Sequence, residues 1–342
     1  MPLFLTQFFA FPVNPLYSLW RFCIYIVNVF VGFFATGTSM EEVSLQIPAY
    51  QWSETHLKSL HIDCTDDVEM SNFVFAEFIP GDEDPNYRAL KDDLEDISAE
   101  DITRMSPEAW GQYQPNGFLR FFTSVAYASR TDNLEMMSED ESGRMPSIKC
   151  LAFEFLEAIM GDEKLHQTPL KIGPRQDGKY RIAQTYGAIV VRRQVRIQKT
   201  PIVTIVAKPR NSEEIGGYPT NGEEPFRAEI LAQEVARLYG QACACSVDQT
   251  DQVVSGHDGW VLAFHGTRMR VVYAYFPKAY LESVRGQVLP SKERIEVLRS
   301  VQLNLKFPDQ RVQALKAVMG LLRFLQAGTY DTAYLKRLGA RR

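Results

Sequence analysis

The sequence predicts an α/β fold from about residue 149 onward, in which a mixed central sheet is flanked by helices, preceded by an acidic α+β region. Residues 201–208 are uncharged up to a terminal lysine, which is typical of a strand buried on both faces. Residues 260–276 read as two strands joined at a His-Gly-Thr turn. The segments around them repeat apolar residues at helical spacing. Helices and strands in this order build a sheet with helices packed on it.

The acidic region is expected to contain a short helix and a strand. Residues 52–62 indicate a capped helix, and residues 71–80 indicate a strand that ends at a proline. The highly charged residues 81–102 are typical of a solvated helix or loop. Residues 131–148 are polar and poor in β-branched side chains, so they predict a linker.

Helices of the predicted α/β domain are indicated by their apolar positions. Residues 150–160 place four apolar side chains on one helical face, and a second helix is expected after Pro225. Strand-like segments at 179–184 and 186–197 lie between them. Two closing helices are predicted, one from about Ser291 and one after Pro308. The expected core positions are Leu151, Phe155, Ala158 and Ile159; Leu231, Val235, Leu238 and Ala242; and Val312, Leu315, Met319 and Leu322, whereas Glu229, Gln233, Arg237 and Gln241 form a polar stripe.

Charge is distributed unevenly along the chain. Residues 1–148 hold 8 Lys and Arg against 23 Asp and Glu, a formal charge of −15, whereas residues 149–342 hold 29 against 19, a charge of +10. The two parts are therefore expected to attract each other. A basic part of this size is compatible with nucleic-acid contact or with a solvated surface neutralised by its acidic neighbour. One hypothesis is that residues 81–102 cover the basic part and screen it from other polyanions.

The N-terminal segment 1–39 is hydrophobic, and residues 16–36 are long enough to span a bilayer. Three interpretations stay open: a single-pass membrane anchor, a signal segment, or an extension without a role in the working protein. The absence of Asn-x-Ser/Thr acceptors and of paired cysteines favours a reducing compartment, cytoplasmic or nuclear, if the segment is not used. The predicted organisation is then a hydrophobic segment (1–39), an acidic region (40–130), a linker (131–148), an α/β domain (149–330) and a basic tail (331–342).

The order of a helix at 150–160, a buried strand ending at Lys208, a helix at 226–241 and a hairpin at 259–276 resembles the restriction-endonuclease-like, or PD-(D/E)XK, superfamily. It looks most like the uncharacterised nuclease-like group of filamentous fungi. The resemblance covers roughly residues 149–285. It implies a metal-binding acid two residues before the lysine, on the same face of the strand, so that both reach one metal and one phosphate.

This sequence departs from that pattern at Val206, which stands where the acid is expected. Valine cannot bind a divalent cation. The resemblance assigns the remaining site positions to Lys208, to a helix glutamate at Glu154 or Glu157, and to Gln233. No metal ligand set is identified, and no cofactor is expected.

Two functions from different classes follow. The first is a degenerate nuclease-like protein that binds nucleic acid or a protein partner without turnover. The second is an active phosphodiesterase that requires Mg²⁺ and uses relocated acids, for example Glu154 and Glu157 or Asp177. A membrane-tethered interaction protein is a third reading that depends on residues 16–36. The missing acid favours the first, and thus a protein that is not an enzyme.

Overall fold

The structure is a computed structural model. It describes residues 51–104, 117–131, 147–160, 187–191, 200–208, 228–246, 255–285 and 293–327, together with the residue pairs that begin at 165, 171, 175, 179 and 183. Residues 44–342 belong to one compact unit. The hydrophobic segment 1–39 and the basic tail 331–342 lie outside the described residues.

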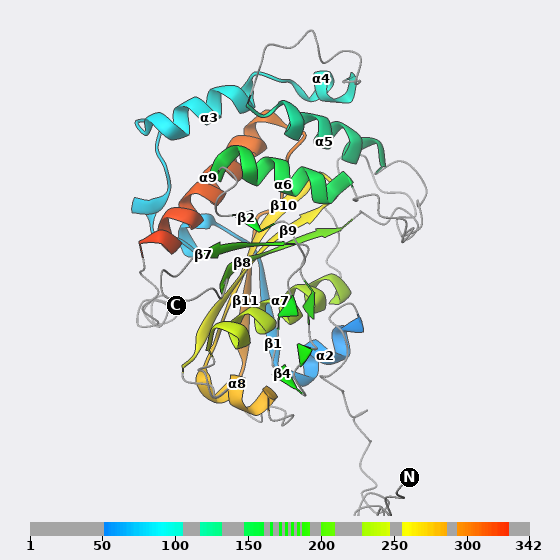
Figure 1. Cartoon of the computed structure of the whole chain (residues 1–342), viewed down its shortest axis with the longest axis vertical. Coiled ribbons are helices and arrows are strands. Elements are labelled where there is room, and N and C mark those ends of the chain that lie inside the picture. Colours follow the sequence, from blue (N-terminus) through cyan, green and yellow to red (C-terminus); the bar gives the residue numbers. More distant parts are fainter. Residues whose placement is uncertain are drawn as a thin grey trace, which may run out of the picture. The chain divides into compact units, whose positions relative to one another are not determined.

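Eight of the described strands form one mixed sheet (Figure 1). Its order is β1-β11-β10-β9-β8-β7-β2, and β12 pairs with β10. These strands are β1 (Ile62–Val68), β2 (Leu165–His166), β7 (Gly187–Val191), β8 (Thr200–Lys208), β9 (His257–His265), β10 (Arg268–Phe276), β11 (Ile295–Ser300) and β12 (Leu303–Asn304). Two separate ladders join β3 (Lys171–Ile172) to β6 (Ala183–Gln184) and β4 (Arg175–Gln176) to β5 (Lys179–Tyr180). The predicted mixed sheet is confirmed.

Four of the longer strands of the sheet run in the same direction. β8 pairs with β9 in parallel, and β1 pairs with β11 in parallel. β10 is antiparallel to both β9 and β11. β8, β9, β11 and β1 therefore all end at the same edge of the sheet.

Helices cover both faces of the sheet (Figure 1). One face packs against α7 (Ala228–Ser246), which in turn contacts α2 (Glu54–Ser59) and α8 (Lys278–Arg285). The other face packs against α6 (Ser147–Met160) and α9 (Pro308–Gln326), which contact α5 (Leu119–Thr131) and α3 (Pro85–Glu95); α4 (Ala99–Arg104) lies against α5. The predicted flanking helices at 150–160 and after Pro308 are confirmed.

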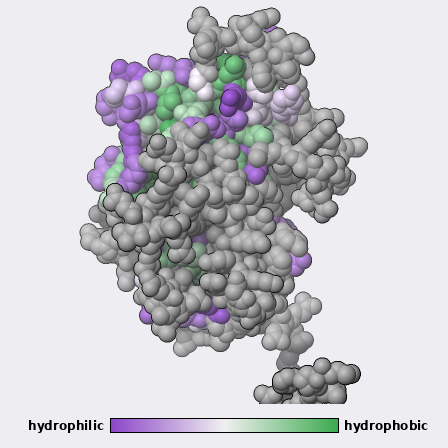
Figure 2. Space-filling view, viewed as in Figure 1, coloured by the Kyte–Doolittle hydropathy of each residue, from purple (hydrophilic) through white to green (hydrophobic). Residues whose placement is uncertain are grey.

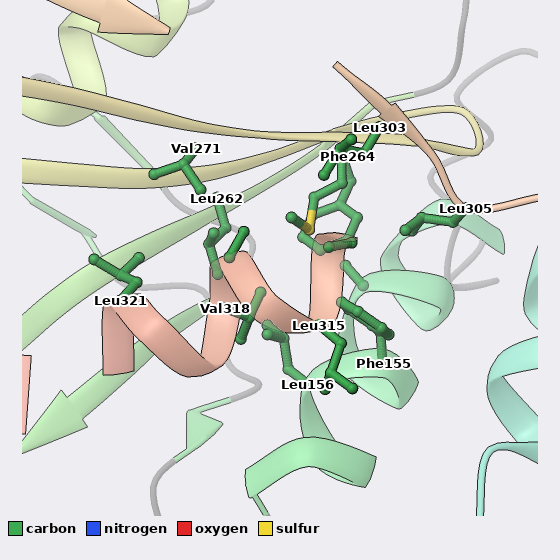
Figure 3. Packing of buried hydrophobic residues seen from close by; sticks show 14 of the residues in the cluster. Phe155, Leu156, Leu262, Phe264, Val271, Leu303, Leu305, Leu315, Val318 and Leu321 are labelled. Carbon is green, nitrogen blue, oxygen red and sulfur yellow. The ribbon is translucent and has the colours of Figure 1, made fainter. Parts of the chain in front are cut away.

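The larger core lies between the sheet and helices α6 and α9. Figure 3 shows Phe155 and Leu156 of α6 meeting Leu262 and Phe264 of β9. Leu315, Val318 and Leu321 of α9 pack against the same group. Every one of these side chains is buried, so the face of β9 that carries Leu262 and Phe264 is excluded from solvent. Burial of this kind of apolar surface is the main source of the fold's stability.

Helix α7 lies close to the opposite face of β9. A Cβ atom on Gly259 would come within 2.8 Å of the Leu238 carbonyl oxygen, so glycine permits this approach. Nearby, the Gln241 side chain joins the helix to two strands. Its Nε2 donates to the Ile202 carbonyl at 2.6 Å, and its Oε1 accepts from the Trp260 amide at 3.0 Å. These bonds fix α7 across the start of β8 and β9.

The acidic region shares the sheet and the core with the rest of the chain. β1 is an edge strand of the sheet, and Tyr87 and Leu94 of α3 are fully buried. Arg311 of α9 is also fully buried, and its guanidinium donates to the carbonyls of Leu94 and Ile97. Residues 81–102 therefore contribute side chains to the core, and the hypothesis that they screen the basic part from other polyanions stays a prediction.

Figure 2 shows hydrophilic side chains gathered over α3 and the segment before it. Asp84 caps α3 by accepting from the Asn86 and Tyr87 amides, and it also pairs with Arg323 of α9. The expected attraction between the acidic and basic parts thus takes the form of specific ion pairs.

The predicted linker 131–148 lies largely outside the described residues, and helices α5 and α6 at its two ends pack against each other.

The predicted strand at 71–80 is wrong. This segment contains two short 3-10 turns, η2 (Met70–Asn72) and η3 (Ala76–Phe78). Its aromatic rings are not arranged in alternation on a sheet: Phe75 and Phe78 both pack against the Phe324 ring of α9. Contact with a helix has overridden the strand propensity of the aromatic residues.

The predicted helix from about Ser291 is also wrong, since residues 295–300 form strand β11. Ile295 and Val297 are buried while Glu296 between them is exposed, which is the period of a strand. Helix α8, at 278–285, comes before this strand. Within the part of the chain that the structure describes, no helix has the length and apolar character to cross a membrane; residues 16–36 lie outside that part.

Candidate functional site

The edge at which the four parallel strands end carries several charged residues. Lys208 ends β8, His265 ends β9, and the two are partners in the strand register. Arg299 lies next to the end of β11, and Asp66 lies near the end of β1. We call this the carboxyl edge. In open α/β sheets ligands bind outside this end of the strands.

Helix α7 covers one face of the carboxyl edge. Gly259 faces Leu238 of α7, and strand side chains alternate, so Ala263 and His265 share that face. Val206 of β8 is the register partner of Ala263 and lies on the same face. The α7 face of β8 and β9 is thus apolar at Val206 and Ala263 and becomes polar at His265.

Val206 occupies the position that the resemblance reserves for a metal-binding acid. It is 1% exposed, and its register partner is the hydrocarbon side chain of Ala263. A cation placed there would find no oxygen from either residue. The side chain of Lys208 lies outside the described part of the chain.

Glu234 of α7 is a buried carboxylate at this edge, with 1% of the residue exposed. Its Oε2 lies 3.0 Å from Nε of Arg299, and its Oε1 lies 3.4 Å from Nε2 of His265. Burial alone would raise the pKa of the carboxyl. The Arg299 charge and the bond from His265 outweigh burial and lower the pKa from 4.5 to about 2. Glu234 is therefore ionised at neutral pH.

Asp66 joins two arginines from neighbouring strands. Its Oδ1 accepts from Nη1 of Arg270 at 3.1 Å and from Nη1 of Arg299 at 2.9 Å. The side chains of Arg270 and Arg299 are 8% and 6% exposed, whereas that of Asp66 is 33% exposed. Asp66, Glu234, His265, Arg270 and Arg299 together are named the charged cluster.

Cys64 lies beside the charged cluster on β1, with its Sγ 3.9 Å from Oδ2 of Asp66. Burial and the neighbouring Asp66 raise the pKa of the thiol from 9.0 to about 12. A neutral thiol is a poor nucleophile. The arrangement thus disfavours thiol chemistry at this edge.

The structure separates the site residues that the resemblance assigned. Glu154 lies on α6 and Gln233 lies on α7, which pack on opposite faces of the sheet. Gln233 is half-buried, and its backbone carbonyl accepts from Arg237 Nη1 at 2.8 Å. Glu157 shares α6 with Glu154, and Asp177 lies outside the described residues. Glu154 and Gln233 are not brought together.

The polar residues on this face are more buried than a solvated stripe would be. The stripe of Glu229, Gln233, Arg237 and Gln241 is not solvated throughout, because Arg237 and Gln241 are buried. Gln241 is buried because it bonds the backbone of β8 and β9. His265, which stands at the turn between two predicted strands, is 3% exposed since α7 covers the end of β9.

Asp66, Glu234, Arg270 and Arg299 were not predicted from the sequence as site residues. A signal existed for Glu234, which lies three residues after Leu231 and four before Leu238, on the apolar side of α7. Arg268 and Arg270 alternate along β10 and so share one face of it. Arg299 could not be assigned, because its segment was predicted to be a helix.

Among the residues that the structure describes, no three or more His, Cys, Asp or Glu side chains are grouped so as to hold a metal ion. Both carboxylates of the charged cluster instead contact guanidinium groups. Comparison of the sequence with known protein families and with curated proteins finds no match.

Proposed function

We propose that this chain is a degenerate restriction-endonuclease-like protein that binds nucleic acid at its carboxyl edge without hydrolysing it. The observation that carries the proposal is the environment of Val206, a buried hydrocarbon in the place of the metal-binding acid at the end of β8. The order of α6, β8, α7 and the β9–β10 hairpin follows the order that the resemblance implies.

Metal-dependent hydrolysis needs carboxylate oxygens that converge on a cation near the scissile phosphate. At the carboxyl edge Glu234 Oε2 faces Arg299, and Asp66 Oδ1 faces both Arg299 and Arg270. A divalent cation would have to displace these guanidinium groups. The arrangement therefore favours an anionic ligand over a metal ion.

Nucleic acid is the anionic ligand that the charge distribution favours. Residues 149–342 carry an excess of 10 positive charges, and Lys208, Arg268, Arg270 and Arg299 fall within one edge of the sheet. Arginine guanidinium groups match the geometry of phosphate oxygens. Phosphate contacts supply most of the affinity for nucleic acid when no sequence is read.

Binding is tested by fluorescence anisotropy with labelled single- and double-stranded DNA and RNA of 20 nucleotides, using the full chain. With two or three phosphate contacts, we expect the affinity to fall about 10- to 40-fold as salt rises from 50 to 200 mM. Lys208→Gln should weaken binding, whereas Lys278→Gln, an exposed lysine on α8, should not. Binding that is indifferent to salt, or absent at 50 mM salt, contradicts the proposal and redirects attention to a protein partner.

Hydrolysis is tested with the same nucleic acids in the presence of Mg²⁺ or Mn²⁺. We expect the strands to stay intact. Cleavage that depends on the metal and is lost in Lys208→Ala would overturn it in favour of an active phosphodiesterase.

A further inference from the structure

The charged cluster has one exposed member. Arg270 and Arg299 each have less than a tenth of their side chain exposed, whereas a third of the Asp66 side chain is exposed. The two Nη1 atoms converge on a single oxygen, Oδ1 of Asp66. The Asp66 carboxylate thus lies between the two guanidinium groups and the solvent.

Charge balance within the cluster depends on that carboxylate. Arg270 and Arg299 are offset by Glu234 and Asp66, and only Glu234 is fully buried against Arg299. Among these four groups of the described chain, moving Asp66 away would leave one positive charge in excess. A phosphate group carries one or two negative charges and several acceptor oxygens, so it can replace the carboxylate on both guanidinium groups.

The backbone around Asp66 departs from regular strand pairing. β1 is an edge strand, and its register with β11 shifts between Thr65 and Val68. Asp67 has a φ of 54°, a left-handed conformation that is unusual for a residue other than glycine. The pairing of β9, β10 and β11 does not depend on these residues.

We propose that Arg270 and Arg299 form a phosphate-binding site and that Asp66 is an internal anion that occupies the site until a phosphate displaces it. The proposal rests on the proposed function for the source of the phosphate, which is the backbone of a nucleic acid. It also gives a screening role, like the one expected of residues 81–102, to a single carboxylate of the acidic region.

The test compares two variants of the same strand. Asp66→Asn removes the competing charge and keeps the side-chain shape. Asp63→Asn is the matched control, because Asp63 also lies on β1 but pairs with Arg294, whose side chain is exposed. Binding is measured by calorimetry with inorganic phosphate and by anisotropy with a 20-nucleotide single-stranded DNA.

We expect Asp66→Asn to bind both probes about tenfold more tightly than the wild type, and Asp63→Asn to change either affinity less than twofold. Equal effects of the two variants would overturn the internal-anion proposal even if DNA binds. Tighter binding of inorganic phosphate without any binding of DNA would support the site and contradict the nucleic-acid function.

A second measurement applies if Asp66→Asn does not fold. Hydrogen exchange of the wild type is followed while inorganic phosphate is added. Displacement of Asp66 predicts faster amide exchange at residues 65–68 and unchanged exchange in β9 and β10. Unchanged exchange at 65–68 under saturating phosphate would rule the displacement out.

Discussion

A buried carboxyl group lies beside each end of strand β9, and the surroundings of the two groups are opposite. Near its start, Asp258 accepts a hydrogen bond from the Tyr273 hydroxyl at 2.8 Å, and burial raises its pKa from 3.8 to about 6 despite that bond. At its end, His265 meets Glu234, which Arg299 also contacts, and the Glu234 pKa falls to about 2. Both residues are almost fully buried. The neighbouring cations decide the sign of the shift.

The largest effect is expected from Glu234→Gln, which neutralises the carboxylate between Arg299 and His265. Loss of one partner from a buried ion pair leaves the other charge uncompensated, so we expect the free energy of unfolding to fall by about 3–5 kcal/mol. Urea unfolding at pH 7 measures it. Glu229→Gln, an exposed position on the same helix, is the control and should change stability by less than about 0.5 kcal/mol.

The pH dependence of the wild type provides a second check on Glu234. Its folded pKa lies below 4.5, so its contribution is present above pH 4.5 and is lost as the pH falls toward 2. Glu234→Gln should lack this acid-dependent loss. Equal urea midpoints of the wild type and of Glu234→Gln at pH 7 would contradict the role given to the charged cluster.

Asp258→Asn should raise the free energy of unfolding, whereas Glu234→Gln should lower it. The folded pKa of Asp258 lies above its ordinary value, so the stability that its protonated form contributes is present below pH 3.8 and is lost as the pH rises through about 6. Asparagine keeps an oxygen for Tyr273 without the buried charge. We expect a gain of about 3 kcal/mol at pH 8 and none at pH 3.5, measured by urea unfolding.

The control for Asp258→Asn is Glu282→Gln, because Glu282 is an exposed acid in an ion pair with Lys278. Exposed pairs of this kind contribute little to stability. A destabilised Asp258→Asn at pH 8 would indicate that the charge of Asp258 is needed in the fold.

A smaller, pH-independent effect is expected from Gln241→Ala at the start of β8 and β9. The change removes two hydrogen bonds to strand backbone groups, at Ile202 and Trp260. We expect a loss of about 2 kcal/mol, equal at pH 5 and pH 8, since the amide is neutral. Gln313→Ala, at an exposed position of α9, is the control. A loss that varies with pH would indicate that this end of the sheet depends on charge.

Elements with a strong period could be predicted from the sequence. α6, α7, α9 and the β9–β10 hairpin each repeat their apolar residues at one spacing over most of their length, and each was predicted. β11 was not, because only six residues alternate and their arginine and serine read as polar. The aromatic residues at 71–80 suggested a strand, but their partner is Phe324, distant in the sequence.

The candidate site was less accessible to prediction than the fold. Val206 and Lys208 could be paired from strand alternation alone, because they are two residues apart. The charged cluster could not, since its members come from β1, α7, β9, β10 and β11. Only the tertiary pairing of β1 with β11 brings Asp66 to Arg299.

That pairing also sets an order on how the chain is completed during synthesis. β1 is made early, but its register partner Ile295 follows Ile62 by more than 200 residues. While the ribosome is still translating the segments between them, β1 has no β11 to join, and the buried groups of α3 have no α9. The acidic region can therefore reach its final place only after β11 and α9 have emerged, which makes its docking a late event in folding.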